Sequence, residues 1–327
     1  MSKHLITYKN CSKGGVSSVI RGRALAEPES HYDAVFELDK GGRFAYSDLP
    51  NVSCRVVGAA KFISYVNYAL NRFSYDEVCV LSNPDAANRL EVPDRTLLTY
   101  EIHSSHFTVV EKELAKLELP KVDIFRVPSE FSAFNVQSML PRRYARRVEV
   151  TPNMINNSEF TPDGQAERFP SGMRPLMWVG RFDKGKGPKY LARVLAKLPD
   201  EFHAFMIISL ETLPGPASDF LSEARALGVE HRIHFRMNLP QSKVASMFRG
   251  AARCGGAFIS TSLQESFGYA LAEAEHCALP IYAFDLPVLP EVVSENAVIV
   301  DPGDVEALAI ALRGSAKSGA STDGRQP

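Results

Sequence analysis

The chain has 327 residues, a formal net charge of −1, 45% apolar residues and 23% charged residues. This length suffices for two domains of ordinary size, and the balanced charge gives no reason to expect nucleic acid as a partner. No apolar run reaches the roughly 20 residues of a membrane-spanning helix. The first residues lead directly into a strand pattern without the apolar core of a signal peptide, so we expect a cytoplasmic protein. The odd number of cysteines, 5, and the absence of Cys-x-x-Cys spacing predict free thiols.

Strand-like and helix-like segments alternate through the first half of the chain. The expected strands are 4–9, 32–38, 53–57, 77–81, 96–100, 121–127 and 147–150, and the expected helices are 16–26, 60–71 and 130–139. Such alternation predicts a parallel sheet with helices on both faces, and these sheets bind ligands at the carboxyl ends of their strands. Gly14 and Gly15 follow the first strand, where backbone without side chains could approach a ligand closely. A plain turn is the alternative interpretation.

The same alternation restarts after a polar connecting segment. The expected strands are 175–179, 202–209, 232–235, 256–259, 281–284 and 297–300, and the expected helices are 188–198, 217–227, 242–252, 267–278 and 305–313. We therefore predict an N-terminal domain over 1–155, an interdomain linker over 156–173 and a C-terminal domain over 174–314. The small, polar residues 315–327 are expected to be disordered.

One helix start in the second half combines phosphate-binding features with carboxylates. The helix carries Phe267, Leu271 and Ala274 on one apolar face, together with Ala270 and Ala278. Its start offers the backbone N–H groups of Ser266, Phe267 and Gly268 at a positive helix end, which suits a phosphate.

Two carboxylates flank this helix start. Glu265 comes just before it, and Glu273 lies eight residues later, roughly 12 Å along a helix axis at 1.5 Å per residue. This is about the span from a sugar, across a diphosphate, to a ribose. Glu273 could accept hydrogen bonds from ribose hydroxyls, or it could be a solvated residue on the helix flank.

A glycine-rich loop follows the first strand of the second half. It places Arg181 and Lys186 between Gly180 and Gly187. Arginine offers phosphate oxygens a bidentate fork, and lysine offers a point charge. Fixed cations there would stabilise a diphosphate leaving group as its bond to a sugar breaks. The loop does not match the Walker pattern, and a solvated basic turn is the alternative.

The Glu-x7-Glu pattern, with Ser-Phe-Gly after the first glutamate, resembles the donor-site signature of family 4 (group 1) retaining GT-B glycosyltransferases. The spacing of Arg181 and Lys186 and several short motifs between residues 125 and 313 follow the order of that family. The resemblance implies the GT-B fold, an α/β architecture in which two Rossmann-like β/α/β domains present parallel sheets across a cleft. It also implies transfer of a sugar from a UDP- or GDP-sugar, with retention, to a glycan, lipid-linked, wall-polymer or small-molecule acceptor.

The resemblance also implies roles for individual residues. Arg181 and Lys186 would hold the diphosphate, assisted by the N–H groups of Ser266, Phe267 and Gly268. Glu273 would hold the ribose, and Glu265 would contact the donor sugar and stabilise positive charge on it. In the first domain, Gly14 and Gly15 would approach the donor. His103, or as second choice His106, would contact a sugar hydroxyl or the acceptor.

We predict neither a metal nor another cofactor. His103 and His106 have a spacing that two metal ligands can use, but no third ligand is evident nearby in the sequence. The chain also has no Asp-x-Asp motif, so manganese-dependent chemistry has no support.

A basic cluster and two rival functions complete the sequence-based expectations. The cluster consists of Arg142, Arg143, Arg146 and Arg147. It could meet an anionic acceptor or the inner face of a membrane, or it could be a solvated turn. The GT-B fold also hosts nucleotide-sugar epimerases and phosphorylases. A non-catalytic sugar- or partner-binding protein with a decayed site is the rival from another class.

Overall fold

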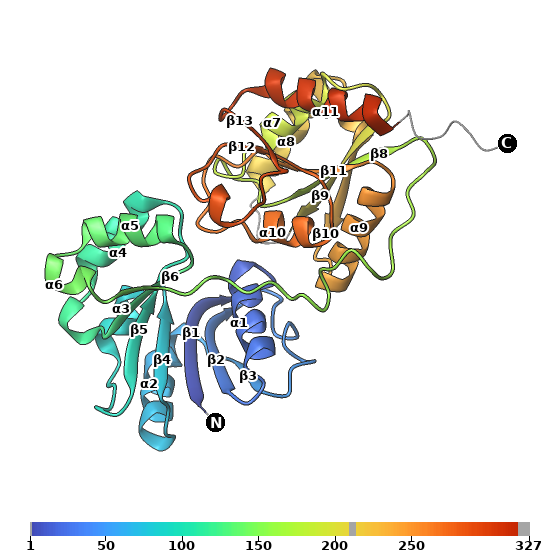
Figure 1. Cartoon of the computed structure of the whole chain (residues 1–327). Helices are drawn as coiled ribbons and strands as arrows, with labels where there is room; N and C mark the ends of the chain where they lie inside the picture. Colours follow the sequence, from blue (N-terminus) through green and yellow to red (C-terminus); the bar gives the residue numbers. More distant parts are fainter. Residues whose placement is uncertain (1, 209–213, 320–327) are drawn as a thin grey trace. The chain divides into compact units, whose positions relative to one another are not determined.

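The computed structural model describes residues 2–208 and 214–319 (Figure 1). The chain divides into two compact units, Met1–Asn156 (unit 1) and Asn157–Pro327 (unit 2). Each unit contains one sheet whose paired strands are all parallel.

The sheet of unit 1 has seven strands in the order β3-β2-β1-β4-β5-β6-β7. They are β1 (Lys3–Cys11), β2 (His31–Asp39), β3 (Val52–Val56), β4 (Glu77–Leu81), β5 (Leu97–Glu101), β6 (Ile124–Val127) and β7 (Val148–Val150). The helices are α1 (Gly15–Ala26), α2 (Ala59–Arg72), α3 (Pro84–Arg89), α4 (Phe107–Lys116), η1 (Leu119–Lys121), α5 (Glu130–Met139) and α6 (Arg142–Ala145). Because the strand order reverses direction at β1, the carboxyl ends of β1 and β4 form a topological switch point, where open α/β sheets bind ligands.

The two faces of this sheet differ in chemistry. One face buries Val80, Tyr100 and Phe125 against α2, α3, α4 and α5. The opposite face packs Ile6 and Phe36 against α1. Since side chains alternate between the faces of a strand, the residues between these apolar positions of β4, β5 and β6 point to the α1 side, and several of them are charged.

The sheet of unit 2 has six strands in the order β10-β9-β8-β11-β12-β13. They are β8 (Arg174–Val179), β9 (Phe202–Ile208), β10 (Ile233–Met237), β11 (Ala257–Ser260), β12 (Ile281–Phe284) and β13 (Val298–Val300). The helices are α7 (Pro188–Leu195), α8 (Pro214–Ala226), η2 (Glu230–Arg232), α9 (Gln241–Arg253), α10 (Tyr269–His276), η3 (Leu289–Glu291) and α11 (Val305–Gly319). Helices α7, α8 and α11 cover one face, and α9 and α10 cover the other (Figure 1). The strand order reverses between β8 and β11.

Residues of the expected linker fold with unit 2. The buried guanidinium of Arg249 on α9 donates hydrogen bonds to the backbone oxygens of Gln165 and Glu159, both at 2.8 Å. Phe160 is buried beside Phe248, with 6.4 Å between ring centroids. The Arg249 side chain thereby fixes the backbone of the expected linker to α9.

The predicted α/β class with two parallel sheets is confirmed, while several element boundaries were wrong. Helices α3, α4 and α6 were not expected, and η1 occupies the beginning of the expected strand 121–127. Helix α10 is shorter than expected, because Gly268 and Ala278 adopt left-handed backbone conformations at its two ends. Residues 315–319 continue α11 instead of being disordered, since an anchored helix extends by one turn at little cost. Residue 209 of an expected strand and residues 320–327 of the expected tail lie outside the described residues.

Candidate functional site

Two loops meet at the carboxyl edge of the sheet in unit 2. Strands β8 and β11 are hydrogen-bonded neighbours, so the loops that follow them lie side by side. The backbone N–H of Leu263 donates to the Gly185 oxygen at 2.7 Å. Gly187 has a φ of +56°, and a Cβ built on it would lie 2.3 Å from the Thr261 oxygen. Only glycine fits this contact, so the glycine-rich loop is shaped by its neighbour across the sheet edge.

The close approach of the two loops brings two predicted site residues, Lys186 and Glu265, together in an ion pair. The Lys186 Nζ lies 2.5 Å from the Glu265 Oε1, and the Ser262 hydroxyl donates to the same oxygen at 2.8 Å. The Lys186 side chain is 24% exposed and the Glu265 side chain 12%. The pair is therefore partly shielded from water but remains reachable by a ligand. Ser262 was not singled out from the sequence.

Arg181 occupies a more open position on the same loop. Its side chain is 58% exposed, and its Nε lies 3.1 Å from the Asp183 Oδ2. The other Asp183 oxygen accepts a hydrogen bond from the Lys186 backbone N–H at 2.9 Å. Asp183 thus shapes the loop and orients Arg181, a role that sequence reasoning missed.

Helix α10 begins directly after the second loop. Gly268 is its N-cap residue with a φ of +96°, and the Leu271 N–H donates to the Gly268 oxygen at 3.0 Å. Phe267 is buried, with its ring centroid 5.3 Å from that of Tyr269. The segment 266–268, predicted to bind phosphate, therefore lies immediately before the first turn of α10, directly after Glu265.

Glu273 is a buried carboxyl on α10. It is 9% exposed and lies among the buried residues Leu271, Ala272 and Ala274. Burial raises the pKa of Glu273 to about 8. A carboxyl that is protonated near neutral pH can donate one hydrogen bond and accept others. The interpretation of Glu273 as a solvated flank residue is therefore wrong, because water reaches little of the side chain.

The glycine turn of unit 1 lies at the carboxyl end of β1. Gly14 is the N-cap residue of α1 in extended conformation, and its oxygen accepts a hydrogen bond from the Ser17 N–H at 3.0 Å. A Cβ built on Gly15 would meet no heavy atom within 4 Å. The turn is therefore open on the side to which a Gly15 side chain would point.

His103 follows β5 and is held by a buried carboxylate. Its Nε2 lies 2.5 Å from the Glu101 Oε1, while Arg23 of α1 donates to both Glu101 oxygens, at 2.9 and 2.5 Å. His106 is exposed at the N-terminus of α4. The signal for Glu101 was a carboxylate at the end of a buried strand, and it was missed from the sequence. Within the described ranges, no group of three or more His, Cys, Asp or Glu side chains is placed to hold a metal ion.

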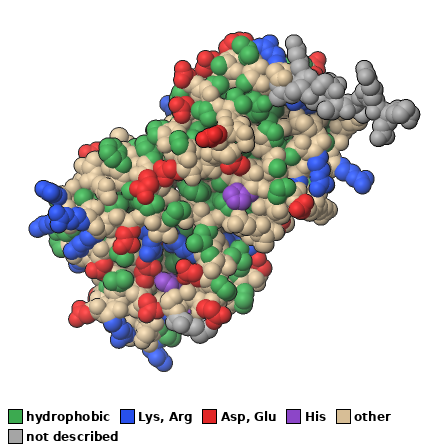
Figure 2. Space-filling model, in the orientation of Figure 1, with side chains coloured by type: hydrophobic (Ala, Val, Ile, Leu, Met, Phe, Trp, Pro, Cys, Tyr) green, Lys and Arg blue, Asp and Glu red, His purple; other side chains and the backbone are tan. Residues whose placement is uncertain are grey.

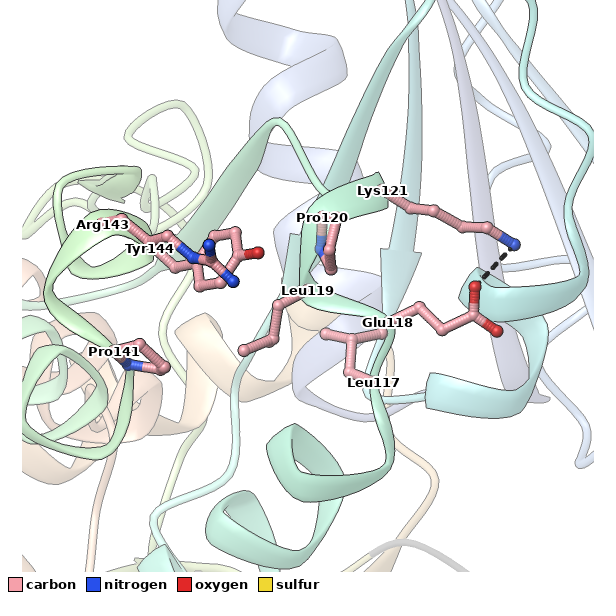
Figure 3. Close-up of a pocket in the computed structure, with 8 residues that line it drawn as sticks. All are labelled: Leu117, Glu118, Leu119, Pro120, Lys121, Pro141, Arg143 and Tyr144. Carbon is pink, nitrogen blue, oxygen red and sulfur yellow. Dashed lines mark ion pairs between the residues drawn. The ribbon is translucent and has the colours of Figure 1, made fainter.

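Arg143 of the basic cluster lines a pocket of about 370 Å³ on unit 1 (Figure 3). Its walls include Leu117, Leu119 and Pro141, and the Arg143 guanidinium lies over the Tyr144 ring, 4.6 Å from its centroid. The space-filling view shows basic side chains projecting at this end of unit 1 (Figure 2).

The four arginines of the cluster do not have equivalent environments. Arg147 donates to the Val122 backbone oxygen, and its guanidinium lies 5.4 Å from the Tyr144 ring centroid. Arg142, Arg143 and Arg146 are exposed. Arg147 is therefore part of the fold, and three arginines remain for an external partner. No helix in the described part of the chain has both the length and the apolar character needed to cross a membrane.

Comparison with known proteins identifies the family to which the second unit is similar. Residues 161–318 match the family model described as glycosyl transferases group 1. This range contains the glycine-rich loop, Glu265 and Glu273, and the match confirms the predicted resemblance to group 1 glycosyl transferases.

Sequence relatives carry glycosyltransferase names. The D-inositol 3-phosphate glycosyltransferase of Mycobacterium marinum is 27% identical over 192 residues, which is 54% of this chain and 39% of that protein. The O-antigen chain mannosyltransferase B of Escherichia coli is 27% identical over 207 residues, 61% of this chain and 52% of that protein. The matched part thus spans about half or less of these relatives.

Solved structures of similar fold cover nearly the whole chain. Anabaena HepE in complex with UDP-glucose has a TM-score of 0.81 at 16% identity, covering 98% of this chain and 92% of that chain. Sucrose-phosphate synthase from Thermosynechococcus elongatus has a TM-score of 0.77 at 17% identity, covering 98% and 91%. Together with the two parallel sheets, these similarities confirm the predicted GT-B fold.

Proposed function

We propose that the protein is a glycosyltransferase that takes a sugar from a UDP- or GDP-sugar. The observation that carries this proposal is the Lys186–Glu265 pair, which joins two loops at one sheet edge beside the start of α10. The family match over 161–318 supports it, as do the glycosyltransferase names of the relatives. The HepE structures with UDP and with UDP-glucose support a uridine nucleotide as the first donor to test.

The donor would bind along the carboxyl edge of unit 2. Arg181 and Lys186 would contact the diphosphate, and the N–H groups of Ser266, Phe267 and Gly268 would add hydrogen bonds at the positive end of α10. Before binding, Glu265 neutralises Lys186. A diphosphate would therefore compete for the ammonium group and leave Glu265 to face the sugar.

Glu273 would bind the ribose. The neutral, buried carboxyl can form two hydrogen bonds with neighbouring hydroxyls without the cost of desolvating a charge. The bound ribose would supply polar partners that Leu271 and Ala272 cannot.

The chemical step would break the bond between the anomeric carbon and a diphosphate oxygen. Lys186 and Arg181 would stabilise the negative charge that develops on the leaving oxygen, the task that a metal performs in other enzymes. Glu265 would stabilise positive charge on the sugar. The acceptor hydroxyl would attack the face from which the diphosphate leaves and transfer its proton to the leaving group, with retention. His103, Gly14 and Gly15 would serve the sugar or acceptor from unit 1.

Calorimetric titration with UDP, GDP and ADP tests the donor site. We expect one nucleotide to bind to the wild type. The double change Arg181→Ala/Lys186→Ala removes two charge-assisted hydrogen bonds, each worth about 1.5–3 kcal/mol, and should weaken binding about 100-fold or more. Lys189→Ala/Arg193→Ala is the matched control, because these two residues of α7 pair with Glu223 on the neighbouring helix α8.

Each outcome of the titration and of product analysis discriminates between functions. A folded sample that binds none of the nucleotides would favour a non-catalytic protein with a decayed site. Conversion of the nucleotide sugar without an acceptor would favour an epimerase, and dependence on inorganic phosphate would favour a phosphorylase. NMR of the transfer product reports the anomeric configuration, and an inverted product would refute retention.

We also propose peripheral contact with an anionic membrane surface through Arg142, Arg143 and Arg146. The exposure of these three arginines supports it, as do the apolar walls of the pocket that Arg143 lines (Figure 3). Sedimentation with vesicles containing phosphatidylserine should fall after changing all three to glutamate and should be unaffected with purely zwitterionic vesicles. If the triple glutamate variant sediments with the phosphatidylserine vesicles as the wild type does, the cluster is a solvated turn.

A further inference from the structure

Unit 1 buries a carboxylate that the proposed function does not yet use. Glu101 has no exposed surface, and it ends β5 two residues before His103. Arg23 occupies both of its oxygens, His103 Nε2 lies against Oε1, and the Cys79 thiol donates to Oε2 at 2.8 Å. Although burial by itself raises the pKa of Glu101, the Arg23 guanidinium and the His103 ring hold it well below its usual range. Glu101 is therefore an ionised acceptor.

A second buried carboxylate lies on the same face of the sheet. Glu77 accepts a hydrogen bond from the Thr99 hydroxyl at 2.5 Å and pairs with Arg126 at 2.7 Å. Its other oxygen contacts the His4 Nδ1 at 3.0 Å. Arg126 also lies 4.0 Å from Glu101, so it links the two carboxylates. The negative charges of Glu77 and Glu101 are thus balanced by the guanidiniums of Arg126 and Arg23.

The two acids contact different histidines at opposite ends of the strands. Glu77 begins β4 and contacts His4, near the amino ends of the strands. Glu101 ends β5 and contacts His103, at the carboxyl edge where α/β sheets bind ligands. A charged network needed only for folding would not require Glu101 to lie at the carboxyl edge of the sheet.

We propose that Glu101 is a positioning residue that fixes the ring orientation and tautomer of His103. This inference rests on the proposed function. An ionised carboxylate can only accept hydrogen bonds, so the His103 nitrogen facing it, Nε2, must carry the proton. When the ring is neutral, Nδ1 is then the acceptor. Carboxylates that orient histidines in this manner act through the ring and need not touch the substrate.

The same carboxylate also ties His103 to the glycine turn. Arg23 lies in the last turn of α1, and α1 begins at Gly15. Because Arg23 donates hydrogen bonds to both oxygens of Glu101, a shift of α1 would move the carboxylate and, with it, His103. Glu101 therefore couples the two parts of unit 1 that we assign to the sugar and the acceptor.

The variant Glu101→Gln tests the tautomer directly. Arg23 has only donors, so it should hold the amide oxygen and leave the amide NH₂ group facing His103. The ring would then have to accept at Nε2 and carry its proton on Nδ1. Nitrogen-15 NMR of the imidazole should show Nε2–H for His103 in the wild type and Nδ1–H in Glu101→Gln. Glu77→Gln, the matched control, should change His4 and leave His103 unaltered.

Kinetics separate positioning from folding. Glu101→Gln should lower kcat about ten-fold or more with little change in the donor KM. The effect should largely vanish in a His103→Ala background, whereas Glu77→Gln should leave kcat unaltered. Equal losses with and without His103 would overturn the proposal, as would a wild-type His103 with its proton on Nδ1. That wild-type measurement needs no variant and stands even if Glu101→Gln fails to fold.

The NMR result also remains informative if the protein transfers no sugar. A tautomer that changes in Glu101→Gln but not in Glu77→Gln would support positioning while the proposed function fails. Active wild type with an unchanged His103 tautomer in Glu101→Gln would refute positioning while the proposed function stands.

Discussion

The buried carboxyl of Glu273 makes a quantitative prediction about how stability depends on pH. The pKa of Glu273 is raised from 4.5 to about 8, so between these values the unfolded chain releases a proton that the folded protein keeps. Stability therefore falls as the pH rises through this window and changes no further above it. Glu273→Gln replaces the carboxyl by a neutral amide of nearly the same shape, which removes this dependence.

The expected size of the effect follows from the shift. At about 1.4 kcal/mol per pKa unit, the shift corresponds to on the order of 5 kcal/mol, an upper bound because a solvated opening can relieve part of it. The difference in unfolding free energy, variant minus wild type, should be small near pH 5. It should grow by up to about 1.4 kcal/mol per pH unit and level off above about pH 8.

Urea unfolding followed by tryptophan fluorescence measures this difference in unit 2, to which Glu273 belongs. The chain has 1 tryptophan, Trp178, which is buried in β8 of unit 2. The exposed Glu295 provides the control Glu295→Gln, which should give a difference independent of pH. A difference for Glu273→Gln that is equally flat between about pH 5 and pH 9 would refute the inference that Glu273 is buried and protonated.

Two further pairs of variants test the construction of the two units. Gly187→Ala should destabilise the protein by about 3 kcal/mol or more, since the new Cβ meets the Thr261 oxygen in addition to the left-handed backbone. Gly41→Ala, at φ +81° with open space around it, should cost only about 1 kcal/mol; equal costs in urea unfolding would contradict the packed-loop contact. Arg147→Ala should cost about 2 kcal/mol because it leaves the Val122 oxygen without its charged donor. The exposed Arg142→Ala should stay within about 0.5 kcal/mol, and a thermal melt that ranks the two variants in reverse would show that the structural role is assigned wrongly.

Local patterns were sufficient for much of the fold. Strand β4 and helix α5 have the predicted bounds, because an apolar run and a capped helix are encoded by adjacent residues. The short helices α3 and α6 were missed, since six and four residues contain too few turns to show a helical period. The predicted extent of α10 failed because Ala278, a good helix former, adopts a left-handed conformation that ends the helix.

The candidate site shows the same division between local and distant information. The sequence by itself indicated that Arg181, Lys186 and Glu265 lie in loops at the carboxyl ends of strands. The tertiary structure decided that Lys186 and Glu265, 79 positions apart, form an ion pair, since β8 and β11 are neighbours although β9 and β10 lie between them along the chain. It also decided that Arg23 forms an ion pair with Glu101, 78 positions away, and that Glu273 is buried. Side-chain periodicity is a property of neighbouring residues, whereas ion pairing and burial depend on strand order and on the surfaces packed around a residue, which no local pattern contains.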